Sequence, residues 1–268
     1  MTVCFALLAL VLAAEPSVVN ANERRFTYAY ESGVMAPGTR EIELWSTWRK
    51  GRADFYSRFD HRLEFEFGLT DRLLTSLYLN WNSVSRNDPA APDATKTEQK
   101  FDGISSEWKY KLSDPVADPV GSALYQEYTM ASDEFGWESK LILDKKVGDT
   151  LAAYNLIVEP EWKFGPSNSG WELGIENVLG VTHFLTPRFA AGLELRNPSL
   201  KTRTSTGLEH SALFLGPTLS YGADGWWIAA TFLGQLPALK RSIGNRQDSL
   251  VLDEHEKTEL RILASLRF

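Results

Sequence analysis

Acidic and basic side chains recur at every second position in many stretches of this 268-residue chain. Residues two apart in an extended strand point to the same side, so this spacing gathers carboxylate, ammonium and guanidinium groups on one face. Such a face can form ion pairs, hold hydrated ions or guide a polar solute. The residues that the alternation assigns to it are Glu41, Glu43, Arg58, Asp60, Arg62, Glu64, Glu66, Glu107, Lys109, Glu159, Glu161, Glu172, Glu176, Glu194, Arg196 and Arg261.

Two interpretations of this charged face stay open. It can line a polar pathway, whose slight excess of acids would favour cations. Alternatively, the charges pair with one another and stiffen a narrow interior that conducts little, because unpaired charges away from water cost several kcal/mol each, roughly.

Histidine, serine and acidic side chains are the groups in this chain that could carry catalytic or metal-binding chemistry. His210-Ser211 is the one adjacent His/Ser pair, and neighbours in a strand point to opposite faces, so they cannot form a hydrogen-bonded dyad. The sequence has no HExxH, GxSxG or phosphate-loop motif. Asp253-Glu254-His255-Glu256 could bind a divalent cation, but a solvated acidic loop is favoured. We therefore predict no catalytic residue, no metal and no cofactor.

The elements that must position the charged face are strands with a period of two. The clearest example runs from Phe55 to Leu69, where odd positions are mainly apolar and even positions mainly charged. The other predicted strands are Arg40 to Arg49, Leu73 to Val84, Phe101 to Leu112, Ser122 to Ser132, Trp137 to Lys146, Leu151 to Phe164, Trp171 to Leu185, Phe189 to Arg196, Leu208 to Tyr221, Trp226 to Gln235 and Glu259 to Phe268. The faces of Ser122 to Ser132 and Trp226 to Gln235 are not assigned. In Leu151 to Phe164, Pro160 predicts a local bulge or strand end.

The predicted connections alternate in length. Short turns are predicted at 70–72, 114–121, 147–150, 186–188 and 222–225, and longer polar loops at 85–100, 165–170, 197–207 and 237–257, with the short connection 133–136 as the exception. Outer-membrane barrels have short periplasmic turns and longer extracellular loops. An up-and-down antiparallel all-β barrel of about twelve strands satisfies this parity. It leaves Arg25 to Gly38 as an odd piece.

Composition agrees with a barrel that spans a membrane. The mean hydropathy of -0.25 is no objection, because only alternate residues of each strand meet lipid. Most of the nine tryptophans lie near predicted strand ends, as an interfacial girdle requires, although core tryptophans of a soluble sandwich are the alternative. The formal net charge of -7 argues against a nucleic-acid partner.

The beginning of the chain reads as a secretory signal. The apolar run Val3 to Ala14 is too short to span a bilayer, and Val19-Asn20-Ala21 supplies small residues for cleavage, with cleavage after Ala14 as the alternative. The only cysteine, Cys4, lies inside this run. We predict a signal peptide at 1–21, a periplasmic extension or plug at 22–39 and the barrel at 40–268.

The last predicted strand has a continuous apolar row. Leu260, Ile262, Ala264, Leu266 and Phe268 fall on the lipid side, and the row ends in a phenylalanine. This pattern resembles the C-terminal signal that the barrel-assembly machinery reads. The predicted location is the cell outer membrane of a Gram-negative bacterium, in contact with lipid and lipopolysaccharide.

Several turns carry a family resemblance. The stretch Pro37 to Leu44, the turn Leu112 to Gly121, and the turns Gly68 to Arg72 and Phe184 to Arg188 resemble those of outer-membrane proteins grouped with meta-pathway phenol degradation. The resemblance implies a porin-like barrel and suggests aromatic or hydrophobic solutes. Its motifs are structural turns, so it transfers no functional residue.

The function predicted from these patterns is an outer-membrane channel or transporter for small solutes, and not an enzyme. A non-transporting structural or interaction barrel is the alternative. A lipid-modifying enzyme of the outer membrane comes third.

Overall fold

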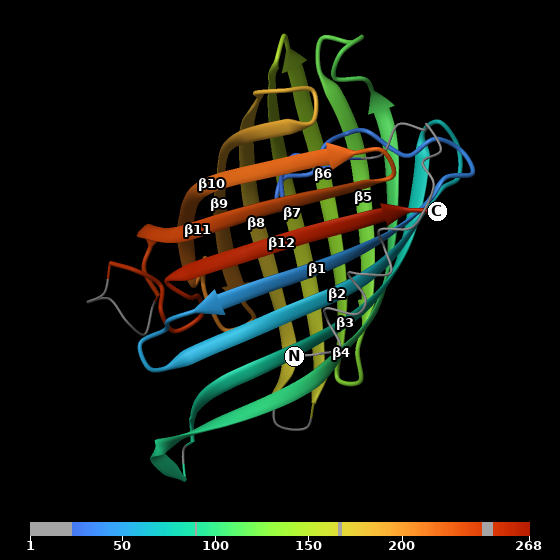
Figure 1. The fold of residues 1–268 in the computed structure, drawn as a ribbon. Helices are drawn as coiled ribbons and strands as arrows, with labels where there is room; N and C mark the ends of the chain where they lie inside the picture. Colours follow the sequence, from blue (N-terminus) through green and yellow to red (C-terminus); the bar gives the residue numbers. More distant parts are fainter. Residues whose placement is uncertain (1–22, 89, 166–167, 243–248) are drawn as a thin grey trace.

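The computed structural model describes residues 23–88, 90–165, 168–242 and 249–268, and the predicted signal peptide lies outside them. Twelve antiparallel strands form one closed barrel (Figure 1). Their bounds are β1 Arg40–Lys50, β2 Tyr56–Gly68, β3 Leu73–Asp88, β4 Ala91–Ser113, β5 Gly121–Met130, β6 Glu134–Val147, β7 Thr150–Gly165, β8 Asn168–Phe184, β9 Phe189–Thr202, β10 His210–Ala223, β11 Trp226–Lys240 and β12 Thr258–Arg267. The predicted fold class is confirmed.

The ring closes between its first and last strands. Consecutive strands pair round the barrel, and β1 pairs with both β2 and β12, from Glu41 opposite Arg267 to Lys50 opposite Thr258. Closure leaves no unpaired sheet edge, which a sheet in lipid could not tolerate. No helix long and apolar enough to cross a membrane occurs among the described residues.

Successive side chains of each strand point alternately into the barrel and out of it, as the period of two predicts. On β1, Glu41 and Glu43 are 1% exposed inside the barrel, while Leu44 is 49% exposed on the outer surface. The outer surface carries many exposed apolar side chains of this kind, including Leu77, Trp81, Leu124, Leu179, Leu193, Phe232 and Ile262. The apolar row of β12 is also on this side.

The girdle prediction is wrong for two tryptophans. Trp45 and Trp227 point inward and are buried, and their indole N–H groups donate to Glu43 at 2.9 Å and to Glu41 at 2.5 Å. The reason is parity, because Trp45 shares the inward register of β1 with Glu41 and Glu43, and Trp227 shares that of β11 with Ala229 and Leu233. Buried indole N–H groups need an acceptor, and the acids supply it.

All four loops that we predicted as long contain strand residues. Most of 85–100 belongs to the β3–β4 hairpin, whose pairing continues to Asn87 opposite Thr95. In Figure 1 this hairpin projects well beyond the rest of the wall. Cross-strand hydrogen bonds and the Arg86–Glu98 ion pair at 3.0 Å extend the ladder through a polar sequence. The segments 165–170, 197–207 and 237–257 are likewise partly strand, because β7 to β9 and β11 run past the predicted ends.

Pro160 does not end its strand. β7 continues through it, with Glu159, Pro160 and Glu161 opposite Gly174, Leu173 and Glu172 of β8. Pairing with β6 is interrupted near Pro160 and resumes without a register shift. Because Pro160 has no N–H group, hydrogen bonds are lost between β7 and β6 only, and the pairing of β7 with β8 is continuous.

The predicted turn at 114–121 is organised by Asp114. Its carboxylate accepts from the backbone N–H groups of Val116 and Ala117 and from Lys111 Nζ at 2.7 Å. The Lys111 bond and the two backbone donors lower the pKa of Asp114 to about 2. Asp114 is therefore ionised, and it fixes the turn between β4 and β5.

Candidate functional site

The N-terminal segment, residues 23–39, lies inside the barrel. Phe26 and Tyr28 pack with Leu151 of β7, Val178 of β8 and Phe214 of β10 in one buried cluster. Tyr30 joins a second cluster on the inner wall that includes Trp45, Tyr125 and Trp227. Both hydrophobic cores therefore lie between this segment and the surrounding strands.

Glu194 of β9 holds the segment through its backbone. This fully buried carboxylate accepts hydrogen bonds from the N–H groups of Thr27 at 3.1 Å, Tyr28 at 2.9 Å and Ala29 at 2.7 Å. Three convergent backbone donors stabilise a carboxylate as a nest does. We predicted that Glu194 lines the lumen, and in the structure it binds the N-terminal segment of the same chain.

Two further wall residues fix the next part of the segment. Asn155 of β7 accepts from Tyr30 N at 2.6 Å and donates to Tyr30 O at 2.9 Å. Asp144 of β6 accepts from Ser32 N at 3.2 Å. These bonds satisfy backbone N–H and C=O groups of the segment, which lies outside the strand pairing of the wall.

At the end of the barrel that bears the short turns, five inward glutamates form an acidic belt: Glu41, Glu43, Glu64, Glu66 and Glu107. The strand register sets Glu41 opposite Glu66 and Glu43 opposite Glu64. Like charges in such pairs are destabilising unless a cation or proton compensates them.

Arg24 of the N-terminal segment supplies positive charge to this belt. It is 7% exposed, interacts electrostatically with Glu43, Glu64 and Glu107, and lies 4.0 Å over the ring of Tyr30. Lys109 and Arg267 add further cations beside the belt. The belt is thus packed against the segment and does not line an open path.

The opposite, loop-bearing half of the barrel contains a cavity of about 800 Å³, which we call the vestibule. Tyr28 and Tyr30 of the N-terminal segment contribute to its lining, together with residues of the β3–β4 hairpin such as Arg86 and Glu98. The vestibule therefore extends from the buried segment to the projecting hairpin.

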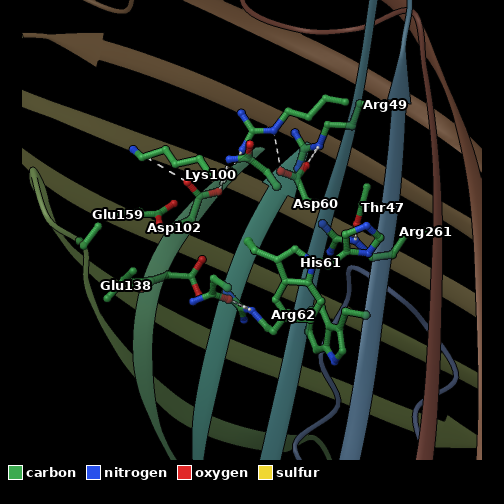
Figure 2. Close-up of a pocket in the computed structure, with 18 of the residues that line it drawn as sticks. Thr47, Arg49, Asp60, His61, Arg62, Lys100, Asp102, Glu138, Glu159 and Arg261 are labelled. Carbon is green, nitrogen blue, oxygen red and sulfur yellow. Dashed lines mark hydrogen bonds and ion pairs between the residues drawn. The ribbon is translucent and has the colours of Figure 1, made fainter. Parts of the chain in front are cut away.

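One wall of the vestibule is rich in arginine (Figure 2). Arg49 contacts Asp60 at 2.9 Å, and Arg62 forms a bidentate pair with Glu127 at 3.0 and 3.3 Å. Arg261 of β12 donates to two neutral oxygens, Thr47 Oγ1 at 2.8 Å and Thr27 O at 3.3 Å. Its guanidinium group lies 3.8 Å over the ring of Tyr28.

Another wall is acidic. Glu138 of β6 pairs with Lys140 at 2.7 Å, and Glu159 and Glu161 of β7 line the vestibule beside it. In the described part of the chain, neither Glu159 nor Glu161 has a hydrogen-bond or salt-bridge partner. Figure 2 shows Glu138 and Glu159 on the other side of the view from Arg49 and Arg261.

A smaller cavity of about 260 Å³ adjoins the vestibule and shares Glu159, Glu161 and Glu176 with it. Its lining includes two histidines, His210 of β10 and His255 of the β11–β12 loop, whose Nε2 atoms are 3.1 Å apart. Burial, reinforced by His210, lowers the pKa of His255 to about 3. At neutral pH the pair is therefore a hydrogen bond between neutral rings.

The β11–β12 loop is only in part the solvated acidic loop that we predicted, because Asp253 and Glu254 are exposed but residues on either side of them are buried. Glu256 is 1% exposed and pairs with Arg52 at 2.8 Å, and Val251 is fully buried in the core cluster. Apolar residues of the loop draw it inward, and the arginine compensates its acid. Among the described residues, no group of three or more His, Cys, Asp or Glu side chains is suited to hold a metal ion.

His210 and Ser211 have different partners, as strand alternation predicts. His210 contacts His255, whereas the Ser211 hydroxyl accepts from Asn197 Nδ2 at 2.8 Å and from Ser199 Oγ at 2.8 Å. This arrangement gives Ser211 no histidine base.

Every predicted lumen residue is on the inside of the barrel, but the set is divided. The vestibule and the smaller cavity are lined by Arg58, Asp60, Arg62, Glu159, Glu161, Glu172, Glu176, Arg196 and Arg261. The remainder, Glu41, Glu43, Glu64, Glu66, Glu107, Lys109 and Glu194, are buried near the N-terminal segment. Strand alternation cannot make this division, because it depends on what fills the lumen.

Arg24 and Glu127 were missed. Arg24 precedes the first strand, where no periodicity applies, and Glu127 lies on β5, whose faces we left unassigned. On β5, the burial of Ala123 and Tyr125 defines the inward register that includes Glu127.

Fold and lumen together define a closed twelve-stranded β-barrel with a charged interior. The chain belongs to the DUF6662 family, described as a family of unknown function, whose model matches residues 18–149 and 133–268. None of the curated proteins compared with the chain matches it.

Three solved barrels have similar structures. The NanC porin has a TM-score of 0.53 at 12% identity, covering 85% of this chain and 100% of its own. The KdgM porin has a TM-score of 0.50 at 12% identity, with 85% and 99% covered. The β domain of the Bordetella autotransporter BrkA has a TM-score of 0.53 at 11% identity, with 87% and 100% covered. At these identities the likeness concerns the fold.

Proposed function

We propose that the protein is an outer-membrane barrel that admits small charged solutes at its loop end, with the N-terminal segment acting as a plug. The observation that carries this proposal is the charged vestibule of about 800 Å³, which the plug residues Tyr28 and Tyr30 help to line. A charged cavity of this size can hold a small solute. It argues against a lumen that is filled completely by paired side chains.

The outer surface supports the location. Apolar side chains such as Leu77, Phe232 and Ile262 are 39% to 56% exposed on the outside of the barrel. Soluble proteins rarely expose so many apolar groups together, whereas lipid solvates them. This surface supports the proposed contact with membrane lipid and, in the outer leaflet, with lipopolysaccharide.

The plug supports a gated pathway rather than a permanently open one. Phe26 packs so closely on β8 that a Cβ at Gly180 would lie 2.6 Å from its ring. Glu194 binds three successive backbone N–H groups of the same segment. Passage through the turn end then requires this segment to move.

Single-channel recording in planar bilayers tests the proposal. The wild-type protein should conduct rarely, and two plug variants, Glu194→Gln and Gly180→Val, should each raise the open probability about tenfold or more. The first replaces one of the two acceptor oxygens that hold the plug by an amide NH2 group and removes the negative charge, and the second displaces Phe26. Gly234→Val is the matched control, because a Cβ at that position meets nothing within 4 Å. Folded variants that stay as closed as the wild type would refute the gated channel.

A structural barrel without transport is the second candidate, and the plug also favours it. The buried clusters around Phe26 and Tyr30 fill the turn end with apolar contacts, as a permanent stopper would. A deletion strain would separate the two, because unchanged solute uptake with altered envelope integrity favours the structural role.

The resemblance to meta-pathway barrels offers a specific solute hypothesis. An aromatic carboxylate could contact both Arg261 and the ring of Tyr28, which already lie 3.8 Å apart. Uptake of radiolabelled benzoate by expressing cells, compared with a strain without the barrel, tests it. Equal uptake rates would exclude this solute class.

We further propose that the outward row of β12, from Leu260 to Phe268, is the segment read by the barrel-assembly machinery. Phe268 is 65% exposed. Phe268→Ala should lower the folded fraction in cells several-fold without changing the stability of the folded barrel. Unchanged assembly would refute this role.

A further inference from the structure

The vestibule has charges of opposite sign on opposing strands. The ring order sets β7 six pairings from β1 in either direction, so these two strands face each other across the lumen. Arg49 and Arg261 lie on β1 and its neighbour β12, and Glu159 and Glu161 lie on β7. Arg49 is paired with Asp60, so among the described residues the charges that set a field across the cavity are Arg261 on one wall and Glu159 and Glu161 on the other.

The acidic wall is available to a ligand. Among the described residues, Glu159 and Glu161 have no hydrogen-bond or ion-pair partner, although both line the cavity. Lys140, a cation near this wall, is already paired with Glu138 at 2.7 Å. Lys163, the cation near Glu161, is likewise paired with Glu172 at 2.7 Å. The two glutamates therefore lie among other acids with acceptor oxygens that form no hydrogen bond, and an entering ammonium group would relieve the repulsion between them.

The arginine wall offers a complementary contact. The hydrogen-bond partners of Arg261 are the neutral oxygens of Thr47 and Thr27, and its guanidinium plane lies over Tyr28. A guanidinium group satisfied only by neutral acceptors gains from a carboxylate, which binds it more strongly. Stacking on Tyr28 fixes the Arg261 side chain in place, so it loses little conformational freedom when it binds an anion.

We propose that the vestibule binds small zwitterions, with their anionic group at Arg261 and their ammonium group at Glu159 and Glu161. This inference deepens the proposed solute-admitting function and rests on it for its biological use. A solute with one charge satisfies one wall, whereas a dipolar solute aligned with the field satisfies both. The two contacts then act as linked binding events.

Isothermal titration of the full-length barrel in detergent micelles tests the inference with three probes of similar size. These are 6-aminohexanoate, hexanoate and hexylammonium. We expect 6-aminohexanoate to bind at least tenfold more tightly than either probe of single charge. Equal affinities for the three probes would overturn the proposal.

Variants assign the two ends of the ligand. Glu159→Gln with Glu161→Gln should weaken the zwitterion and hexylammonium about tenfold and leave hexanoate unchanged. Arg261→Gln should weaken the zwitterion and hexanoate and leave hexylammonium unchanged. Arg188→Gln, at an exposed site in the β8–β9 turn outside the cavity lining, is the control. An unchanged zwitterion affinity in the glutamate variant, which loses no internal partner, would refute the assignment even if Arg261→Gln misfolds.

Binding in micelles does not require transport. Conductance in the plug variants without zwitterion binding would therefore overturn this inference alone. Zwitterion binding by a barrel that never conducts would instead overturn the channel and keep the binding site.

Discussion

Arg24 shows how one side chain can decide the charge balance of the lumen. The acidic belt packs carboxylates against one another, as in Glu43 opposite Glu64, and Arg24 reaches it from a segment that belongs to no strand. Removing one partner of a buried charge network leaves the others uncompensated, which costs more than an exposed pair is worth.

We therefore predict that Arg24→Met lowers the free energy of unfolding by about 3–5 kcal/mol. Urea titration in detergent, followed by tryptophan fluorescence, measures it, because Trp45 lies 4.7 Å from the guanidinium group. Arg188→Gln is the control, since Arg188 and its partner Asp224 are both more than half exposed and should change stability by less than about 1 kcal/mol. Equal stability of the two variants would contradict this role of Arg24.

His255 makes the β11–β12 loop sensitive to acid. Burial lowers its pKa to about 3 from an ordinary value near 6.5, so the docked loop prefers the neutral ring. The docking energy is fully present above pH 6.5 and falls as pH drops from 6.5 towards 3, by about 1.4 kcal/mol per pH unit. The titratable and charged groups around the ring are His210 of β10, Arg49 of β1, Arg196 of β9 and Glu259 of β12.

Hydrogen exchange of residues 249–257 measures this effect. We expect exchange of the Val251 amide, which donates to Gln235 Oε1 at 2.6 Å, to accelerate between pH 6.5 and 4.5 after correction for intrinsic rates. His255→Phe should abolish the acceleration, because it keeps the ring without the charge. A corrected rate independent of pH would contradict docking through a neutral His255.

Among the strands, β4 depends on an irregular glycine. Gly103 has a φ of +102° at the point where the β3–β4 register shifts between Asn80 and Trp81. A Cβ there would lie 2.2 Å from the carbonyl oxygen of Met130 on β5. The glycine thus permits a bulge that accommodates the long hairpin in the curved wall.

Gly103→Ala should accordingly lower the free energy of unfolding by about 1–3 kcal/mol, since both the backbone angle and the contact with β5 are strained. Gly234→Ala, in a strand and free of contacts within 4 Å, should be close to neutral. Urea titration compares the two. A larger loss at Gly234 would contradict the bulge explanation.

Strand periodicity was sufficient to predict all twelve strands, but it could not find their outer ends. Between Phe55 and Leu69 one face lies on the outer surface and is mainly apolar, and the other faces the lumen and is mainly charged, so the sequence alternates clearly. In the projecting hairpin both faces are polar, as at Arg86 and Glu98, and the apolar signal vanishes while the backbone ladder continues. The predicted loop at 85–100 is wrong for this reason.

For the molecule as a whole, the closed wall predicts resistance to denaturation by detergent. We expect the unboiled protein from the membrane fraction to migrate faster on gels than the boiled protein, because the paired ring stays compact. Gel shift and fractionation together measure this. Recovery of the unboiled, unshifted protein in a soluble periplasmic fraction would contradict an outer-membrane barrel.

The inward direction of the lumen residues could be predicted from sequence, whereas their division into buried and cavity-lining groups could not. That division depends on residues 23–39, which bind the wall through backbone atoms at Glu194 and Asn155. Contacts made by backbone N–H groups do not depend on residue type, so no pattern in the sequence predicts them. Phe26, Tyr28 and Tyr30 alternate, but a strand and a plug alternate alike.

The position of residues 23–39 also bears on the order in which the wall is built. The pairing of β1 with β12 joins the most distant parts of the barrel sequence and carries the largest entropic cost of loop closure. The N-terminal segment is tethered to β1 yet contacts β7 at Asn155 and β9 at Glu194, on the far side of the ring. Bound there first, it would curve the growing sheet around itself and bring β1 towards β12 before they zip together.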